Sequence, residues 1–232
     1  TQILMDGGPA KKVLNELPRV MSPFDKSIDA LIITNPDADH IGGFLDILKT
    51  YKVDVVFESG TLSDSKTFQN LKNEIKNKNI PDILVKKEMI LDLGGEAKLN
   101  ILFPDRDVSE WATNDGSVVA QLIYGKNKIM LTGDATIKTE KIILAENGAS
   151  QLKSTVLKVG HHGSRTSTSP SFVQAVAPIY ALISNGKDNK YGHPHKETLD
   201  TLEQFGAKIL RTDLLGTIIM KCDILGPCEI NW

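Results

Sequence analysis

Short apolar runs recur along this chain, and several of them end abruptly in a group of acidic, histidine or glycine residues. The runs ALIIT, KIMLT, STVLKV and YALI lead into N-P-D-A-D-H, G-D, G-H-H-G-S and S-N-G-K-D-N-K-Y-G-H-P-H, in that order. Runs of this length and composition predict buried strands. In α/β folds, ligands bind beyond the carboxyl ends of the strands. The pattern therefore predicts an α/β fold with its functional residues at strand ends.

The other apolar runs and the helical spacing between them complete the expected fold. Further strands are predicted at 2–6, 53–59, 97–104, 118–125, 208–213 and 216–222, and helices at 42–51, 63–79, 136–148, 169–177 and 196–206. Ser169 before Pro170 predicts a helix start, and Gly148 and Gly206 predict helix ends. Strands and helices alternate early and late, and strands dominate from about 83 to 134. This order predicts an αββα sandwich, two mixed sheets between flanking helices.

Composition sets the broad class of the protein. With 232 residues, 41% hydrophobic and 24% charged, and no internal repeat or linker, the chain is expected to form a single domain, 1–232. No apolar run approaches the roughly 20 residues that span a bilayer, so we expect a soluble chain. The formal net charge is −2. Any contact with nucleic acid must therefore come from a local basic patch, and composition neither supports nor excludes DNA.

The two cysteines, Cys222 and Cys228, lie close together near the C-terminus. Their spacing around Gly226 and Pro227 suits a hairpin in which they form a disulfide, which would favour an oxidising, extracytoplasmic compartment. The alternative is a pair of unlinked thiols. The chain begins at Thr1, so no targeting segment indicates the compartment.

The polar groups at the strand ends contain side chains that bind cations. Asp37, Asp39 and His40 lie within four residues of one another, and Asp134 follows the run KIMLTG. Carboxylates and imidazoles at a strand-to-helix turn can converge on a divalent ion. The alternative is that these acids cap the following helices. Adjacent histidines between glycines, as at His161 and His162, are more typical of a functional loop than of a packed core.

A polar loop from 184 to 195 follows the run YALI. Lys187 and Lys190, together with backbone N–H groups, are suited to a phosphate, and His193 is suited to donate a proton. The alternative is a surface loop whose polar residues have no specific role. Asn114 and Ser117 are predicted to add polar groups to the same rim.

Together the motifs D-x-D-H-I-G-G, L-T-G-D, K-V-G-H-H-G-S and S-N-G-x-x-N-x-Y-G-H-P resemble the C-terminal domain of the ComEC competence protein family. That family belongs to the metallo-β-lactamase superfamily, whose αββα fold carries a dinuclear metal site. The resemblance implies two divalent ions, zinc or manganese. It places Asn35 and Asp37 on the first ion, Asp39, His40 and His161 on the second, and Asp134 between them.

This sequence departs from the family in two respects. Asn35 stands where ComEC-like proteins have a histidine, so the first site is expected to be weak or empty. The family also begins with a strand hairpin that carries a D-V-G-Q-G-D-like motif, and this hairpin is expected to be missing before QILMDGGP. Its loss would open a sheet edge and put the activity of the chain in doubt.

The resemblance implies hydrolysis of DNA, a single strand during uptake, by a metal-activated water. Asp39 or Asp134 would orient the water, and His193, His162 and Ser164 would contact the substrate or protonate the leaving group. The predicted substrate contacts are Asn114, Ser117, His162, Ser164, Lys187, Asn189 and Tyr191. One alternative is hydrolysis of a small phosphoester in a pocket walled by Tyr191 and Trp111, and another is a metal-poor domain that binds single-stranded nucleic acid. Full-length ComEC-like proteins also imply attachment to membrane helices in a longer parent protein.

Overall fold

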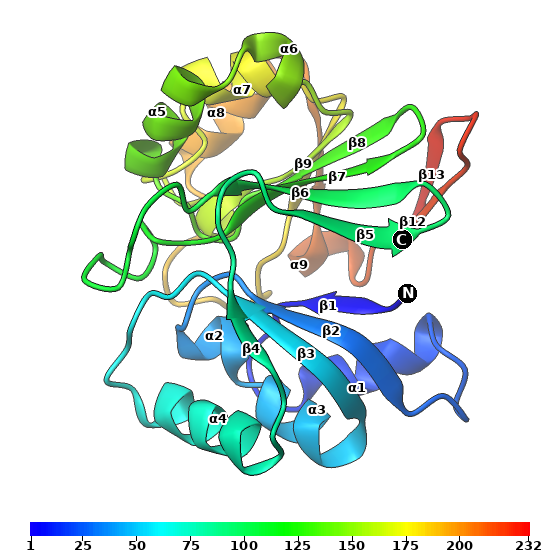
Figure 1. Cartoon of the computed structure of the whole chain (residues 1–232). Coiled ribbons are helices and arrows are strands. Elements are labelled where there is room, and N and C mark those ends of the chain that lie inside the picture. Colours follow the sequence, from blue (N-terminus) through cyan, green and yellow to red (C-terminus); the bar gives the residue numbers. More distant parts are fainter. The chain divides into compact units, whose positions relative to one another are not determined.

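The strands form a four-stranded sheet and a seven-stranded sheet, which belong to two different units of the chain (Figure 1). The computed structural model describes every residue from Thr1 to Trp232. Unit 1 comprises Thr1–Lys86 and Arg106–Val118, and unit 2 comprises Lys87–Asp105 and Val119–Trp232. No helix has the length and apolar character needed to span a membrane.

The sheet of unit 1 is parallel throughout. Its strands lie in the order β1 (Ile3–Met5), β2 (Ser27–Ile33), β3 (Lys52–Glu58) and β4 (Asp82–Leu84). One face is covered by α1 (Lys12–Glu16), α2 (Ala38–Ile41), α3 (Phe44–Thr50) and α4 (Lys66–Asn77), with the short 3-10 helix η1 (Leu17–Arg19) after α1 (Figure 1). Each strand returns through one or more of these helices, and such crossovers keep neighbouring strands parallel.

Helix α4 illustrates how the sequence builds this layer. Phe68, Leu71 and Ile75 recur at helical spacing and are almost completely buried in the core of unit 1. The hydroxyl of Ser65 accepts the N–H of Phe68 at 3.2 Å and so caps the first turn. The remaining face of the helix carries lysines and other polar residues, as expected for a solvated face.

The sheet of unit 2 is mixed. Its order is β11 (Lys208–Arg211), β10 (Tyr180–Ile183), β9 (Val156–Lys158), β8 (Asn127–Leu131), β7 (Val119–Tyr124), β6 (Ala97–Phe103) and β5 (Ile90–Gly94). Strands β8 to β11 are parallel, and the pairs from β5 to β8 are antiparallel. Because β8, β9 and β10 are parallel, the segments that follow them start at the same edge of the sheet.

Helices cover one face of this second sheet. They are α5 (Ile137–Glu146), α6 (Ala149–Leu152), α7 (Pro170–Val176) and α8 (Lys196–Gln204) (Figure 1). A 3-10 turn, η2 (Gly160–Gly163), follows β9, and α9 (Thr212–Leu215) follows β11. The expected helix start is confirmed, because Ser169 accepts the N–H of Phe172 and Pro170 opens α7.

The expected α/β fold with two main sheets is confirmed, and each predicted strand and helix has a counterpart. Both sheets were predicted to be mixed, but only that of unit 2 is, because every strand of unit 1 returns through helices and pairs in parallel. Gly206 follows α8 with a φ of 73°, as a helix end requires, whereas Gly148 has a φ of −68° and begins α6. The individual strands β4 and β5 and the short helices α1, α2, α6 and α9 were not predicted. They contain too few residues to establish a periodic pattern.

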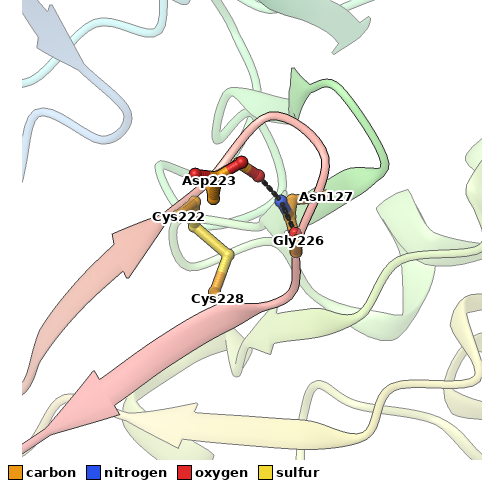
Figure 2. Close-up of a disulfide and its surroundings, with 5 residues drawn as sticks. All are labelled: Asn127, Cys222, Asp223, Gly226 and Cys228. Carbon is orange, nitrogen blue, oxygen red and sulfur yellow. Dashed lines mark hydrogen bonds between the residues drawn. A yellow bond between two sulfur atoms is a disulfide. The ribbon is translucent and has the colours of Figure 1, made fainter.

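The two cysteines are joined in a C-terminal hairpin of unit 2. Strands β12 (Ile219–Cys222) and β13 (Cys228–Asn231) pair antiparallel, with Cys222 opposite Cys228, and the two sulfurs form a disulfide. The amide of Asn127, at the start of β8, donates to the carbonyls of Asp223 and Gly226 at 2.8 and 3.0 Å (Figure 2). The disulfide therefore closes a loop that is hydrogen-bonded to the large sheet.

We predict that the Cys222→Ser, Cys228→Ser double variant lowers the free energy of unfolding of unit 2 by about 2 kcal/mol, because a short cross-linked loop restricts the unfolded chain. Urea denaturation with and without dithiothreitol measures the effect. The reductant should shift the midpoint of the wild type but not that of the double variant. A wild-type midpoint that ignores the reductant contradicts the prediction.

Candidate functional site

The turn between β2 and α2 carries the first group of predicted ligands. Asn35 is fully buried, its Oδ1 accepts the N–H of Asp37 at 2.7 Å, and its Nδ2 donates to Oδ1 of Asn114 at 2.6 Å. Both ends of the amide are therefore engaged within unit 1. Asn35 shapes the turn that presents Asp37 and ties it to the segment 106–118.

The capping alternative fails for Asp37. The residue occupies the N-cap position of α2, but its side chain makes no capping hydrogen bond. Instead, Oδ2 accepts the hydroxyl of Thr113 at 3.0 Å. Asp39 lies in the first turn of the same helix and is exposed. The two carboxylates are thus presented beyond the end of β2, where the sequence predicted them.

His40 is held by Asp6, a carboxylate outside the predicted motifs. The imidazole is 2% exposed, and its Nδ1 lies 2.8 Å from Oδ2 of Asp6. Asp6 also accepts the backbone N–H and the hydroxyl of Thr34, at 2.9 and 2.6 Å. An Nδ1–H that donates to Asp6 puts the ring's lone pair on Nε2, the arrangement typical of metal-binding histidines.

Glycines allow Asp6 and His40 to approach each other. The N–H of Gly7 donates to the carbonyl of His40 at 2.6 Å, and the N–H of Gly43 donates to the carbonyl of Gly8 at 2.9 Å. A Cβ on Gly43 would lie only 2.2 Å from the carbonyl oxygen of Gly7. The D-G-G and H-I-G-G segments are therefore packed backbone to backbone, which no larger residue permits at Gly43.

In unit 2, the segments after β8 and β9 bring Asp134 and His162 together. Asp134 is 3% exposed, and its Oδ2 lies 3.6 Å from Nε2 of His162. Nδ1 of His162 lies 2.6 Å from the carbonyl of Ser184, which only an N–H can satisfy. In the neutral ring, Nε2 is then an acceptor that lies 3.6 Å from a carboxylate oxygen, an arrangement that a cation between them would stabilise. A carboxylate and a neutral imidazole are suitable ligands for Zn²⁺ or Mn²⁺, so these residues fit a divalent metal ion.

The capping alternative fails for Asp134 as well, because the N-cap of α5 is Thr136.

The backbone at the two adjacent histidines is strained. His161 and His162 have φ angles of 48° and 53°, in the left-handed region that L-residues avoid. Each such residue costs on the order of 1–2 kcal/mol, and strain of this kind concentrates at functional sites.

The adjacent histidines have different surroundings. His162 faces Asp134, whereas Nδ1 of His161 lies 3.0 Å from the hydroxyl of Thr166, and its ring centroid lies 5.6 Å from that of His193. The family resemblance implied that His161 binds the metal and His162 the substrate. The contact with Asp134 makes His162 a candidate ligand beside His161.

The loop 184–195 is fixed by the side chain of Asn189. Its Oδ1 accepts the N–H of His193 at 2.9 Å, and its Nδ2 donates to the carbonyls of His193 and Gly186 at 2.7 and 3.0 Å. The N–H of His195 also donates to the carbonyl of Gly163 at 2.9 Å. Asn189, predicted as a substrate contact, thus acts within the structure as the brace of this loop.

The ring of His193 lies among other rings. Its centroid is 4.8 Å from that of His195 and 5.8 Å from that of Tyr191, in addition to the contact with His161. Burial, followed by the charges of His195 and His161, lowers the pKa of His193 to about 4. His193 is therefore neutral at pH 7, whereas the proton donation predicted from the sequence needs the charged imidazolium.

The remaining predicted substrate contacts differ in exposure. Ser117 is completely buried, and Ser164 is 4% exposed and hydrogen-bonded to Thr166 at 3.0 Å. Lys187 and Tyr191, by contrast, are exposed. Of these four residues, only the last two present their side chains to solvent.

A second buried carboxylate, Glu140, was also missed. It is 2% exposed on α5 and accepts the N–H groups of Thr168 and Ser169 at 2.5 and 2.9 Å. Burial raises the pKa of Glu140, while these hydrogen bonds act in the opposite direction. Glu140 fixes the loop that follows the two histidines. No sequence signal marks it, since glutamate is common on exposed helix faces.

We predict that Asp6→Asn weakens metal binding by 10- to 100-fold, because the charge that orients and polarises His40 is lost. Isothermal titration with Mn²⁺ or Zn²⁺ measures the dissociation constant. The matched control is Asp29→Asn, since Asp29 accepts a backbone N–H from Gln2 without contacting a histidine. Equal affinities for Asp6→Asn and the wild type would show that Asp6 has no role in the metal centre.

Comparison with known proteins agrees with these features. The family model described as Metallo-beta-lactamase superfamily matches residues 7–187. ComE operon protein 3 of Bacillus subtilis (strain 168) is 35% identical over 194 residues, which are 83% of this chain and 24% of that protein. Competence protein ComA of Neisseria gonorrhoeae is 40% identical over 105 residues, 45% of this chain and 15% of that protein. This chain thus spans a quarter or less of the length of these relatives.

Solved structures support the same fold. The metallo-β-lactamase fold protein YhfI from Bacillus subtilis superposes with a TM-score of 0.55 and 15% sequence identity, covering 90% of this chain and 83% of that one. At this identity the likeness establishes the fold alone. The resemblance to ComEC-type competence proteins, first seen in the motifs, is confirmed by the curated relatives.

Proposed function

This chain belongs to the metallo-β-lactamase superfamily of metal-dependent hydrolases, and we propose that it cleaves phosphodiester bonds in DNA. The observation that carries the proposal is the Asp134 carboxylate facing Nε2 of His162, whose Nδ1–H is held by Ser184. Its counterpart in unit 1 is His40, held in the same tautomer by Asp6. Two histidines so oriented present Nε2 to a cation.

We propose that each unit binds a divalent metal ion through its own donors. Support comes from the superfamily model, whose match from 7 to 187 includes both donor groups. The proposed ligands are Asp37, Asp39, His40, Asp134 and His162, with His161 as the alternative to His162. Zn²⁺ and Mn²⁺ both suit this mixture of carboxylate and imidazole.

The chemistry follows from the roles of these side chains. When bound, the ions supply a reactive water near neutral pH and stabilise negative charge on the phosphate. Asp39 or Asp134 would orient the attacking water through its carboxylate oxygens. His193 lies beside His161 and is proposed to contact the leaving group. Lys187, exposed on the same loop, is proposed to neutralise a flanking phosphate.

DNA is the substrate that the relatives favour, because the similar proteins include one named for competence. The small-phosphoester alternative expects an enclosed pocket around Tyr191. Tyr191 is 62% exposed, which favours a substrate that extends across an open surface. We propose single-stranded DNA, acted on by this chain as part of a longer, membrane-attached protein.

A second candidate function, binding of single-stranded nucleic acid without cleavage, is favoured by Asn35. Its amide binds Asp37 and Asn114 and so shapes the turn, and an asparagine supplies no imidazole to the first metal site. A centre that retains only its second ion would bind a phosphate and hydrolyse it slowly. Metal content and cleavage together separate the two functions.

We predict about two Mn²⁺ or Zn²⁺ ions per chain at saturation, and metal-dependent cleavage of single-stranded DNA that Asp134→Ala abolishes. Mass spectrometry of metals and a gel-based nuclease assay measure these quantities. The matched control is Asp200→Ala on α8, which breaks only an exposed ion pair with Lys196 and should leave both unchanged. Wild-type protein with no bound metal and no cleavage after Mn²⁺ addition would leave only the binding function.

We predict that Asn35→His strengthens binding of the first ion by at least 10-fold, because it adds the imidazole that ComEC-like proteins carry there. A histidine is larger than the fully buried Asn35, so Asn35→Asp, which has the size of the original residue, serves as a second variant. It keeps an oxygen that can accept the N–H of Asp37. Titration with Mn²⁺, after thermal unfolding has verified the fold of each variant, measures the affinity. Wild-type affinity in both folded variants would contradict this role for position 35.

A further inference from the structure

Tyr191 exposes an aromatic face on a loop that is otherwise fixed. Its ring is 62% exposed and stacks on His193, with centroids 5.8 Å apart and planes inclined by 27°. The backbone of His193 is in turn held by Asn189 through an N–H and a carbonyl. The ring is therefore largely accessible to solvent, and it lies on a loop whose fixed backbone leaves little further cost of ordering upon binding.

Positive charge accompanies this ring. Nζ of Lys190 lies 5.3 Å from the ring centroid of Tyr191, and Lys187 is exposed on the same loop. Aromatic rings bordered by lysines are the elements with which proteins hold single-stranded nucleic acid, the ring against a base and the lysines against phosphates. The loop combines both elements within five residues, from 187 to 191.

We propose that Tyr191 is a stacking platform for an unpaired nucleobase of the DNA strand that the protein cleaves. The proposal rests on the proposed function and specifies how the strand is held. The rings of Tyr191, His193 and His161 form a continuous series, with centroid separations of 5.8 and 5.6 Å. A base on Tyr191 therefore belongs to a nucleotide that flanks the reacting phosphate.

Stacking on Tyr191 would also give the protein a preference for single strands. In a duplex, both faces of each internal base are covered by neighbouring bases, so Tyr191 would have to extrude one. Every base has a π face, so the platform is tolerant of sequence. Selection for single-stranded DNA then comes from Tyr191, and the lysines contribute affinity for any strand.

Fluorescence anisotropy with a labelled oligothymidylate, in EDTA and at one fixed salt concentration, tests the platform without cleavage. Tyr191→Ala should weaken binding by about 10-fold or more, the usual effect of removing a stacked aromatic. Tyr191→Phe, which keeps the ring and loses only the hydroxyl, should bind as the wild type does. An abasic oligonucleotide of the same length should bind equally to all three proteins.

Two further variants separate stacking from other effects. Phe24→Ala removes an aromatic ring that is 95% exposed in unit 1 and should not change binding of either probe. Lys187→Ala should weaken binding of the oligothymidylate and the abasic strand alike. Unchanged oligothymidylate binding by Tyr191→Ala, or no measurable binding by the wild type, overturns the platform.

The outcome is distinct from that of the nuclease test. Binding that depends on Tyr191, in a protein that does not cleave with Mn²⁺, leaves the platform standing and removes the nuclease. Conversely, if the wild type cleaves DNA and Tyr191→Ala binds it as tightly as the wild type does, the nuclease stands and the platform is removed. Because Tyr191 is exposed, Tyr191→Ala is expected to fold, and its circular dichroism melting curve verifies this.

Discussion

An imidazole offers a lone pair to a cation only from the nitrogen that carries no proton, and the candidate site depends on this constraint. In unit 1 the proton of His40 is directed to Nδ1 by Asp6, and in unit 2 that of His162 is directed to Nδ1 by the carbonyl of Ser184. Asp6 directly follows strand β1 and Ser184 directly follows strand β10, so the ends of these strands position both hydrogen-bond partners. The parallel strands, the glycine contacts and the left-handed histidines serve to hold these two hydrogen bonds.

Much of the fold followed from local patterns in the sequence. Apolar runs gave the long strands, and the helix start at Ser169 came from a cap whose hydrogen bond the structure contains. The same logic located Asp37, His40 and Asp134, because each follows a run of buried residues. Asp6 follows such a run as well, before two glycines, and the signal was present but not applied to it.

Other features had no local signal. Glu140 lies within a helix, and only the tertiary fold turns it toward the N–H groups of Thr168 and Ser169. Which of two adjacent histidines faces Asp134 depends on two left-handed φ angles, which glycine neighbours permit but do not specify. The hydrogen bonds of Asn35 likewise involve Asn114, far away in sequence, so its role in the turn was not predictable from the motif alone.

The path of the chain between the two units has a consequence for protein synthesis. Unit 1 takes up Arg106–Val118 only after β5 and β6 of unit 2 have been made, and this late segment supplies the partners of Asn35 and Asp37. A nascent chain that ends before Arg106 leaves the buried amide of Asn35 without Asn114. The N-terminal half therefore cannot reach its final structure on the ribosome until Val118, about halfway along the chain, has emerged.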